Sequence, residues 1–182
     1  LYFRFKGDGM HNIPDGPCII APNHQSFLDG LFVASFIKRK TFKTTYFYAK
    51  KKHVKGWFLR FMASRNNVIV MDINNDLKES IQKLAEVLKS GKKIILFPEG
   101  TRTKTGEMGE FKKTFAILSR ELNVPIVPVA IAGAYQAFPT GSKMPKLGTP
   151  IHINFLQPIN PQEYTLDSLV DTVKQMINEK IS

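Results

Sequence analysis

Short apolar runs alternate with helical patterns along most of this chain. Seven runs of four to six residues read as strands: Tyr2–Lys6, Cys18–Ala21, Thr45–Ala49, Val68–Asp72, Ile94–Phe97, Ile126–Ile131 and Ile151–Phe155. Helical spacing of apolar residues follows Asn75 and stops at Gly91, and it returns over Phe111–Leu122 and from Leu166 to Ile181. This alternation predicts an α/β fold: a single domain with a mostly parallel sheet of about seven strands, flanked by helices.

Length and composition agree with one domain. The chain has 182 residues, of which 43% are hydrophobic, so it can bury a sizeable core and is not disordered. Its one cysteine, Cys18, excludes an intramolecular disulfide and a multi-cysteine metal cluster. Because the sequence starts LYFRFKGDGM, without an initiator Met, we expect residues 1–182 to be a fragment of a longer chain.

One long uncharged stretch raises the question of a membrane-spanning helix. It covers 19 residues, from Val124 to Ser142. Three prolines and two glycines interrupt it, namely Pro125, Pro128, Pro139, Gly133 and Gly141. The stretch is therefore not expected to form a spanning helix.

The formal net charge of +11 favours an acidic partner, such as nucleic acid, an anionic membrane or a phosphorylated substrate. Gly30 to Met71 holds ten Lys and Arg and no Asp or Glu, whereas the other 140 residues hold 16 basic and 15 acidic side chains. Residues 50–65 read KKKHVKGWFLRFMASR, and cations around an aromatic cluster are typical of a segment that lies among lipid headgroups. A plain solvated face and a nucleic-acid surface are the alternatives, although no nucleic-acid module motif is present.

A first group of polar residues follows the expected strand Cys18–Ala21. His24 is expected in the strand-to-helix turn, and Asp29 in the first turn of the next helix, after Ser26 in the spacing of a capping box. With His24 outside the helix, the Asp29 carboxylate can point back at the imidazole and make it a general base that activates a hydroxyl. In the simpler interpretation, Asp29 only caps the helix and His24 is an ordinary loop histidine.

A second group, FPEGTR at residues 97–102, follows the expected strand Ile94–Phe97. The Gly-Thr-Arg turn offers backbone N–H groups, a hydroxyl and a forked guanidinium, which are suited to binding phosphate. If the two strands are parallel, both polar loops open on the same edge of the sheet, where α/β proteins bind ligands. An ordinary polar loop with a surface arginine is the alternative.

Together these motifs resemble the glycerolipid acyltransferase family, whose best-known members are the lysophosphatidic acid acyltransferases. The resemblance covers nearly the whole chain: Ile13–Pro17, the H-x4-D block from His24 to Asp29, Lys50 after an apolar strand, FPEGTR at 97–102, Phe111–Lys113, and VPIVPV from Val124 to Val129. An H-x4-D block alone is a weak signal. Followed about 70 residues later by FPEGTR and then by VPIVPV, it is specific.

The resemblance implies an O-acyltransferase of phospholipid biosynthesis or remodelling. A fatty acyl group passes from the thioester of acyl-CoA or acyl carrier protein to the hydroxyl of a lysophospholipid or glycerol phosphate. The implied site residues are His24 as general base, Asp29 as its partner, and Glu99, Gly100, Thr101 and Arg102 for the acceptor phosphate, with Lys50 facing the same anionic substrate. The block from Val124 to Val129 is associated with the acyl donor, or is simply a buried strand. No metal and no cofactor beyond the acyl donor is implied.

The remaining expectations concern partners and location. We expect an anionic membrane surface as partner, no nucleic acid, and a position on the cytoplasmic side of a membrane, peripheral or anchored through a missing segment. The rival hypothesis is a non-enzymatic basic module that binds anionic membrane or nucleic acid. The chain also departs from the family pattern: Ile73 stands where an arginine is usual, and Thr114 where a glycine often follows Phe-Lys-Lys. The missing arginine leaves room for another lysophospholipid acceptor, such as lysophosphatidylethanolamine.

Overall fold

A computed structural model describes residues 4–50, 68–71, 77–142 and 144–181 of the chain. The strands are β1 (Arg4–Asp8), β2 (Ile19–Pro22), β3 (Thr45–Lys50), β4 (Val68–Met71), β5 (Lys93–Ile95), β6 (Ile126–Ala132) and β7 (Pro150–Phe155). The α-helices are α1 (Asp29–Phe36), α2 (Arg39–Phe42), α4 (Leu77–Lys89), α5 (Thr114–Leu122), α6 (Ala134–Ala137) and α7 (Leu166–Ile181). Two 3-10 helices, η1 (Met10–Asn12) and η3 (Pro161–Glu163), complete the described elements.

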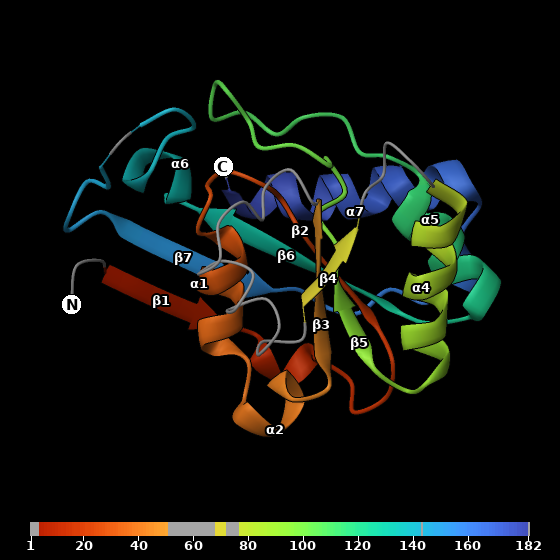
Figure 1. The fold of residues 1–182 in the computed structure, drawn as a ribbon. Helices are drawn as coiled ribbons and strands as arrows, with labels where there is room; N and C mark the ends of the chain where they lie inside the picture. Colours follow the sequence, from red (N-terminus) through yellow and green to blue (C-terminus); the bar gives the residue numbers. More distant parts are fainter. Residues whose placement is uncertain (1–3, 51–67, 72–76, 143, 182) are drawn as a thin grey trace.

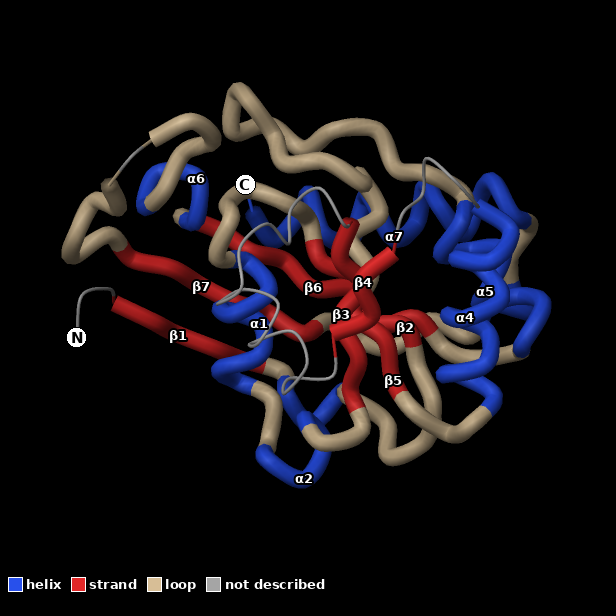
Figure 2. Tube along the Cα trace, viewed as in Figure 1, coloured by secondary structure: helices blue, strands red, loops and turns tan. Residues whose placement is uncertain are grey.

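The seven described strands form one sheet, in the order β1-β7-β6-β2-β5-β3-β4 (Figure 2). Strands β6, β2, β5, β3 and β4 are mutually parallel, and β1 is parallel to β7. Among the described pairs only β6 and β7 are antiparallel, so β1 and β7 run against the other five strands. The α/β class and the mostly parallel sheet expected from the sequence are confirmed.

Helices cover both faces of the sheet. Consecutive strand residues point to opposite sides, so they pack against different helices. Ile19 and Ala21 of β2 pack in the core under α4, α5 and α7, whereas Cys18 and Ile20 pack in the core under α1 and α6. In Figure 1, α1 lies in front of the sheet and α7 behind it. The strands nearest the middle are buried on both faces, as in other parallel sheets.

Several element boundaries differ from those expected. β5 ends at Ile95 rather than Phe97, and Pro98, whose nitrogen has no hydrogen to donate, follows closely. The helix expected from Phe111 begins at Thr114, because the Lys112 N–H donates to the Pro98 carbonyl at 3.0 Å and holds that residue in the loop. The apolar pattern included Phe111 because it is buried, although it precedes the helix.

Other expectations fall on residues that the structure does not describe. These are the first residues of the strand expected at Tyr2–Lys6, the end of Val68–Asp72 at Asp72, the helix start at Asn75, Ile73 in place of the family arginine, and the basic and aromatic residues from 51 to 65. The uncharged stretch Val124–Ser142 forms β6, α6 and a following loop, in agreement with the expectation that it is not a spanning helix. Among the described helices, none has the length and apolar character needed to cross a membrane.

Candidate active site

The two polar loops meet at one edge of the sheet. The His24 loop leaves the carboxyl end of β2 and the FPEGTR loop leaves that of β5, and the two strands are parallel neighbours. Hydrogen bonds join the loops directly. The His24 N–H donates to Glu99 Oε1 at 2.7 Å, and the Thr103 N–H donates to the His24 carbonyl at 2.9 Å. The juxtaposition expected from α/β topology is therefore present.

His24 and Asp29 are in contact. The distance from His24 Nδ1 to Asp29 Oδ2 is 2.8 Å. The Asp29 side chain is fully buried, whereas 21% of the His24 side chain is exposed. Because a carboxylate only accepts, Nδ1 carries the proton of this hydrogen bond and Nε2 keeps a lone pair. This is the arrangement of a histidine general base with an orienting carboxylate.

Asp29 also organises the start of α1. Its Oδ2 accepts the backbone N–H groups of Gln25 at 2.6 Å and Ser26 at 2.7 Å. Of the two hydrogen bonds of the expected capping box, only the one from the Ser26 N–H to the Asp29 carboxylate is present. The Ser26 hydroxyl instead accepts from the Leu28 N–H at 3.4 Å, and Leu28 is the N-cap of α1. Capping and orienting the histidine are thus compatible roles of one carboxylate. Burial raises the pKa of Asp29 above its ordinary value, although the His24 hydrogen bond opposes that shift.

The imidazole is held on a second side by Phe97. The two rings stack with centroids 4.1 Å apart and planes 25° from parallel. The stack limits tilting of the imidazole, and the Asp29 hydrogen bond limits its rotation in the ring plane. The orientation of the His24 imidazole is therefore fixed by the protein itself.

Glu99 lies inside the protein, 6% exposed, and both of its carboxylate oxygens accept backbone N–H groups. Besides His24, the donor is Gly109, whose N–H lies 2.8 Å from Oε2. Burial raises the pKa of Glu99, and the two backbone hydrogen bonds oppose this effect. This expected substrate-binding residue thus joins the histidine loop to the segment that precedes α5.

Arg102 lies beside the dyad loop. Its guanidinium carbon is 5.7 Å from the ring centroid of Phe27, three residues after His24. Arg102 and Thr101 also line a cavity of about 360 Å³, together with residues of the 103–110 segment such as Lys104. Gly100, in a left-handed turn with φ 67°, lies close to the Lys112 side chain. The cavity lining thus combines the cations Arg102 and Lys104 with the carboxylates Glu99, Glu107 and Glu110, so the donors available to an anion are the side chains of Arg102, Lys104 and Thr101.

The other expected residues are placed as follows. Lys50 ends β3, which is parallel to β5, so its backbone lies at the same edge of the sheet as the two loops; its side chain is outside the described part. Residues 126–129 of the VPIVPV block are a buried strand next to β2. No described residues form a cluster of three or more His, Cys, Asp or Glu side chains that could hold a metal ion.

Sequence reasoning missed the side chains that brace these loops. Asn23 is buried, and its amide pairs with the N–H of Ile131 at 2.7 Å and the carbonyl of Ile131 at 3.0 Å. Gln25 Oε1 accepts the Tyr135 N–H at 3.2 Å. Asn23 and Gln25 are the polar neighbours of His24 in the sequence, and this position could have marked them as residues that support the loop. Tyr135 lies far along the chain, and no local pattern marks it.

Known proteins resemble this chain in sequence. A family model described as Acyltransferase matches residues 4–132. A chloroplastic 1-acyl-sn-glycerol-3-phosphate acyltransferase of Brassica napus is 34% identical over 79% of this chain and 42% of its own length. A 1-acyl-sn-glycerol-3-phosphate acyltransferase of Pseudomonas aeruginosa is 32% identical over 72% of this chain and 51% of its own length. The chain thus spans about half, or less, of the length of these relatives.

A solved structure also resembles this fold. The crystal structure of the 1-acyl-sn-glycerophosphate acyltransferase PlsC from Thermotoga maritima superposes with a TM-score of 0.83. That match covers the whole of this chain and 72% of the other, at 27% sequence identity.

Proposed function

Because this chain belongs to the glycerolipid acyltransferase family, we propose that it transfers a fatty acyl group from a thioester to the hydroxyl of a phosphorylated glycerolipid. The observation that carries the proposal is the 2.8 Å hydrogen bond from His24 to the buried Asp29, in a loop bonded directly to the FPEGTR loop. We take acyl-CoA and acyl carrier protein as the candidate donors.

In the proposed reaction, His24 Nε2 takes the proton of the acceptor hydroxyl as its oxygen attacks the thioester carbon. A C–O bond forms and the C–S bond breaks. The thiolate leaves and takes the proton back from His24, so that an ester and a free thiol are the products. Asp29 stabilises the imidazolium that exists between these two proton transfers, and Phe97 keeps the ring in place.

For the acceptor we propose 1-acyl-sn-glycerol 3-phosphate, the substrate in the names of the relatives. Arg102 and Thr101 supply donors for its phosphate, whereas the Gly100 N–H already donates to the Phe97 carbonyl at 3.1 Å. We assign Glu99 to positioning, because its two oxygens already accept N–H groups of the protein. Lysophosphatidylethanolamine is the second acceptor to test, because Ile73 stands where the family usually carries an arginine.

The experiment is an acyl-transfer assay with a panel of lysolipids and both donors. Arg102→Ala is expected to raise the KM for the phosphorylated acceptor about 10- to 100-fold, because a charge-assisted contact is lost, and to leave kcat less affected. Arg120→Ala, on α5 and bonded to the Pro161 carbonyl, is the matched control. An Arg102→Ala variant with unchanged KM would contradict the phosphate site.

The rival hypothesis, a basic module without catalysis, makes a different prediction in the same assay. It predicts binding to anionic lipid but no acyl transfer to any acceptor with either donor. Acyl transfer by the wild type, lost in His24→Ala, excludes it.

A further inference from the structure

The segment after β6 touches both loops of the candidate site. Tyr135, in α6, donates its N–H to Gln25 Oε1 at 3.2 Å and its hydroxyl to the Lys104 carbonyl at 2.8 Å. Gln25 is the neighbour of His24, and Lys104 follows two residues after Arg102. One side chain and its own backbone therefore connect the loop of the proposed base with the loop of the proposed phosphate site.

The ring of Tyr135 adds a third contact. Gly106, with φ 97°, lies so close that a Cβ there would be 2.9 Å from Tyr135 Cδ1. Nearby, the Thr140 hydroxyl donates to the Thr103 carbonyl at 2.8 Å, and Thr103 Oγ1 accepts the N–H of Gly106 at 3.0 Å. Residues 103–106 are thus held by contacts to Tyr135 and Thr140, which follow β6, and by the Thr103 hydroxyl within the segment itself.

These contacts matter because residues 101–107 contain no helix or strand. Besides the bond of the Thr103 N–H to the His24 carbonyl, the geometry of such a loop depends on contacts to more rigid elements. α6 supplies such a support: it begins directly after β6 and is packed through the buried Ala134 and Ala137.

We propose that Tyr135 is a positioning residue: through Gln25 and Lys104 it sets the distance between the His24 base and the Arg102 phosphate site. This inference rests on the proposed function. The Tyr135 hydroxyl affects binding of the acceptor by holding the backbone at Lys104, and it takes no part in proton transfer. Its removal lets the Arg102 loop shift away from the dyad.

The test begins with Tyr135→Phe, which removes only the hydroxyl and its hydrogen bond to Lys104. The acceptor KM is expected to rise about two- to tenfold, the effect of one lost hydrogen bond, while the donor KM stays unchanged. Tyr46→Phe is the matched control. Tyr46 lies on β3, away from both loops, and its hydroxyl accepts a hydrogen bond from Lys92 Nζ at 3.2 Å. Thr140→Val removes the neighbouring hydrogen bond to Thr103 and is expected to act in the same direction.

Combination with Arg102→Ala separates positioning from general loosening of the fold. If Tyr135 acts by placing Arg102, the acceptor KM penalty of Tyr135→Phe disappears when Arg102 is already Ala. The same penalty in both backgrounds, or an effect mainly on kcat, overturns the inference. Unfolding by urea shows whether the variants are folded, and Thr140→Val serves in place of Tyr135→Phe if the latter is not.

The two proposals fail in different ways. Absence of acyl transfer by the wild type to every acceptor overturns the proposed function. Normal wild-type transfer with an Arg102-dependent KM, but no effect of Tyr135→Phe or Thr140→Val, overturns only the role of Tyr135.

Discussion

At the scale of single residues, two buried carboxylates fix the candidate site. Asp29 and Glu99 each accept two backbone N–H groups and are almost completely enclosed. Such hydrogen bonds compensate part of the desolvation that raises the pKa of each group. One carboxylate acts directly on the imidazole, and the other acts on the backbone of the same histidine.

The first prediction concerns Asp29→Asn. An amide can donate to Nδ1 and so favours the wrong imidazole tautomer, which leaves no lone pair at Nε2. We expect kcat to fall roughly 10²- to 10⁴-fold with little change in either KM. Steady-state kinetics measure this, with the exposed Asp15→Asn as a control for the loss of one carboxylate. Full turnover by Asp29→Asn would show that the dyad assignment is wrong.

The second prediction concerns the pH dependence of stability. Because burial raises the pKa of Glu99, the folded protein binds this proton more tightly than the unfolded chain does. The stability that the group contributes is therefore fully present below its unfolded pKa, about 4.3, and is lost as pH rises through the folded pKa.

Glu99→Gln removes this titration. We expect the unfolding free energy of the wild type, minus that of Glu99→Gln, to decrease as pH rises from about 4 to 7, by at most about 1.4 kcal/mol per pH unit. Urea unfolding at a series of pH values measures the difference. A difference that is constant or grows with pH would contradict the raised pKa.

At the scale of elements, Asn23 replaces a missing stretch of strand pairing. β2 ends at Pro22, and the Asn23 amide bonds both the N–H and the carbonyl of Ile131 on β6. The side chain thus extends the pairing of β2 with β6 up to the residue before His24. The position of His24 therefore depends on the rigidity of the central strands.

The third prediction follows from these two bonds. Asn23→Ala leaves two buried backbone groups of Ile131 unpaired, which is expected to destabilise the protein by about 2–5 kcal/mol. Gln136→Ala removes an exposed amide from α6 and is expected to change stability by less than about 0.5 kcal/mol. Denaturant unfolding of both variants tests the contrast, and an equal effect of the two changes would refute it.

The sequence pattern predicted the elements better than the contacts between them. All seven expected strands are present: the buried strands β2, β5 and β6 are apolar runs that can be read locally, whereas β1 is mostly exposed. Helix α7 has the expected bounds, whereas α2 and α6 are four residues each and too short for a periodic signal. The contact of His24 with Asp29 was one of two interpretations that their spacing allowed. The bonds of Glu99 to Gly109 and of Tyr135 to Lys104 were not predictable, since they depend on how distant loops fold over one another.

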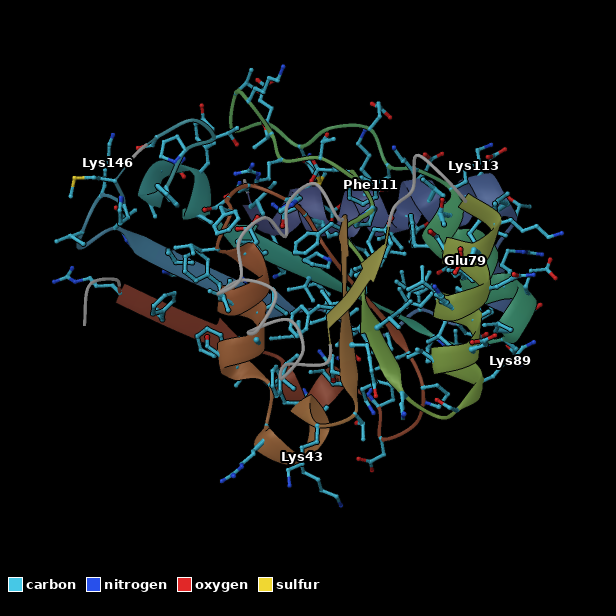
Figure 3. The ribbon with its side chains drawn as sticks, in the orientation of Figure 1. Lys43, Glu79, Lys89, Phe111, Lys113 and Lys146 are labelled. Atoms are coloured by element: carbon cyan, nitrogen blue, oxygen red, sulfur yellow. The ribbon has the colours of Figure 1, made fainter. Side chains whose placement is uncertain are left out.

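At the scale of the whole molecule, the excess positive charge is concentrated between Gly30 and Met71, although single lysines are spread over the surface. Lys43, Lys89 and Lys146 lie at well-separated edges of the molecule (Figure 3), and all three are exposed. The dense basic and aromatic run of residues 51–65 lies outside the described residues, and its role as a membrane contact stays a prediction.

The fourth prediction tests that role with vesicles. The protein is expected to float with vesicles that contain anionic lipid, and to be released when salt rises from about 0.1 M to 1 M, because screening shortens the range of charge attraction. Replacement of Lys51, Lys52 and Lys55 by Gln should weaken binding more than the same change at Lys43, Lys89 and Lys146. Equal loss in the two triple variants would indicate that only total charge matters.

The pairing of β1 with β7 has a consequence for how the chain is made. β1 is synthesised before the other described strands, but among these it lies at the edge of the sheet and pairs only with β7, so that Arg4 pairs with Pro150. β1 therefore lacks this partner until residues 150–155 have been synthesised. Pairing at such a distance along the chain slows folding and exposes an open strand edge meanwhile. Synthesis of this domain therefore includes an interval in which β1 is open to pairing with other nascent chains.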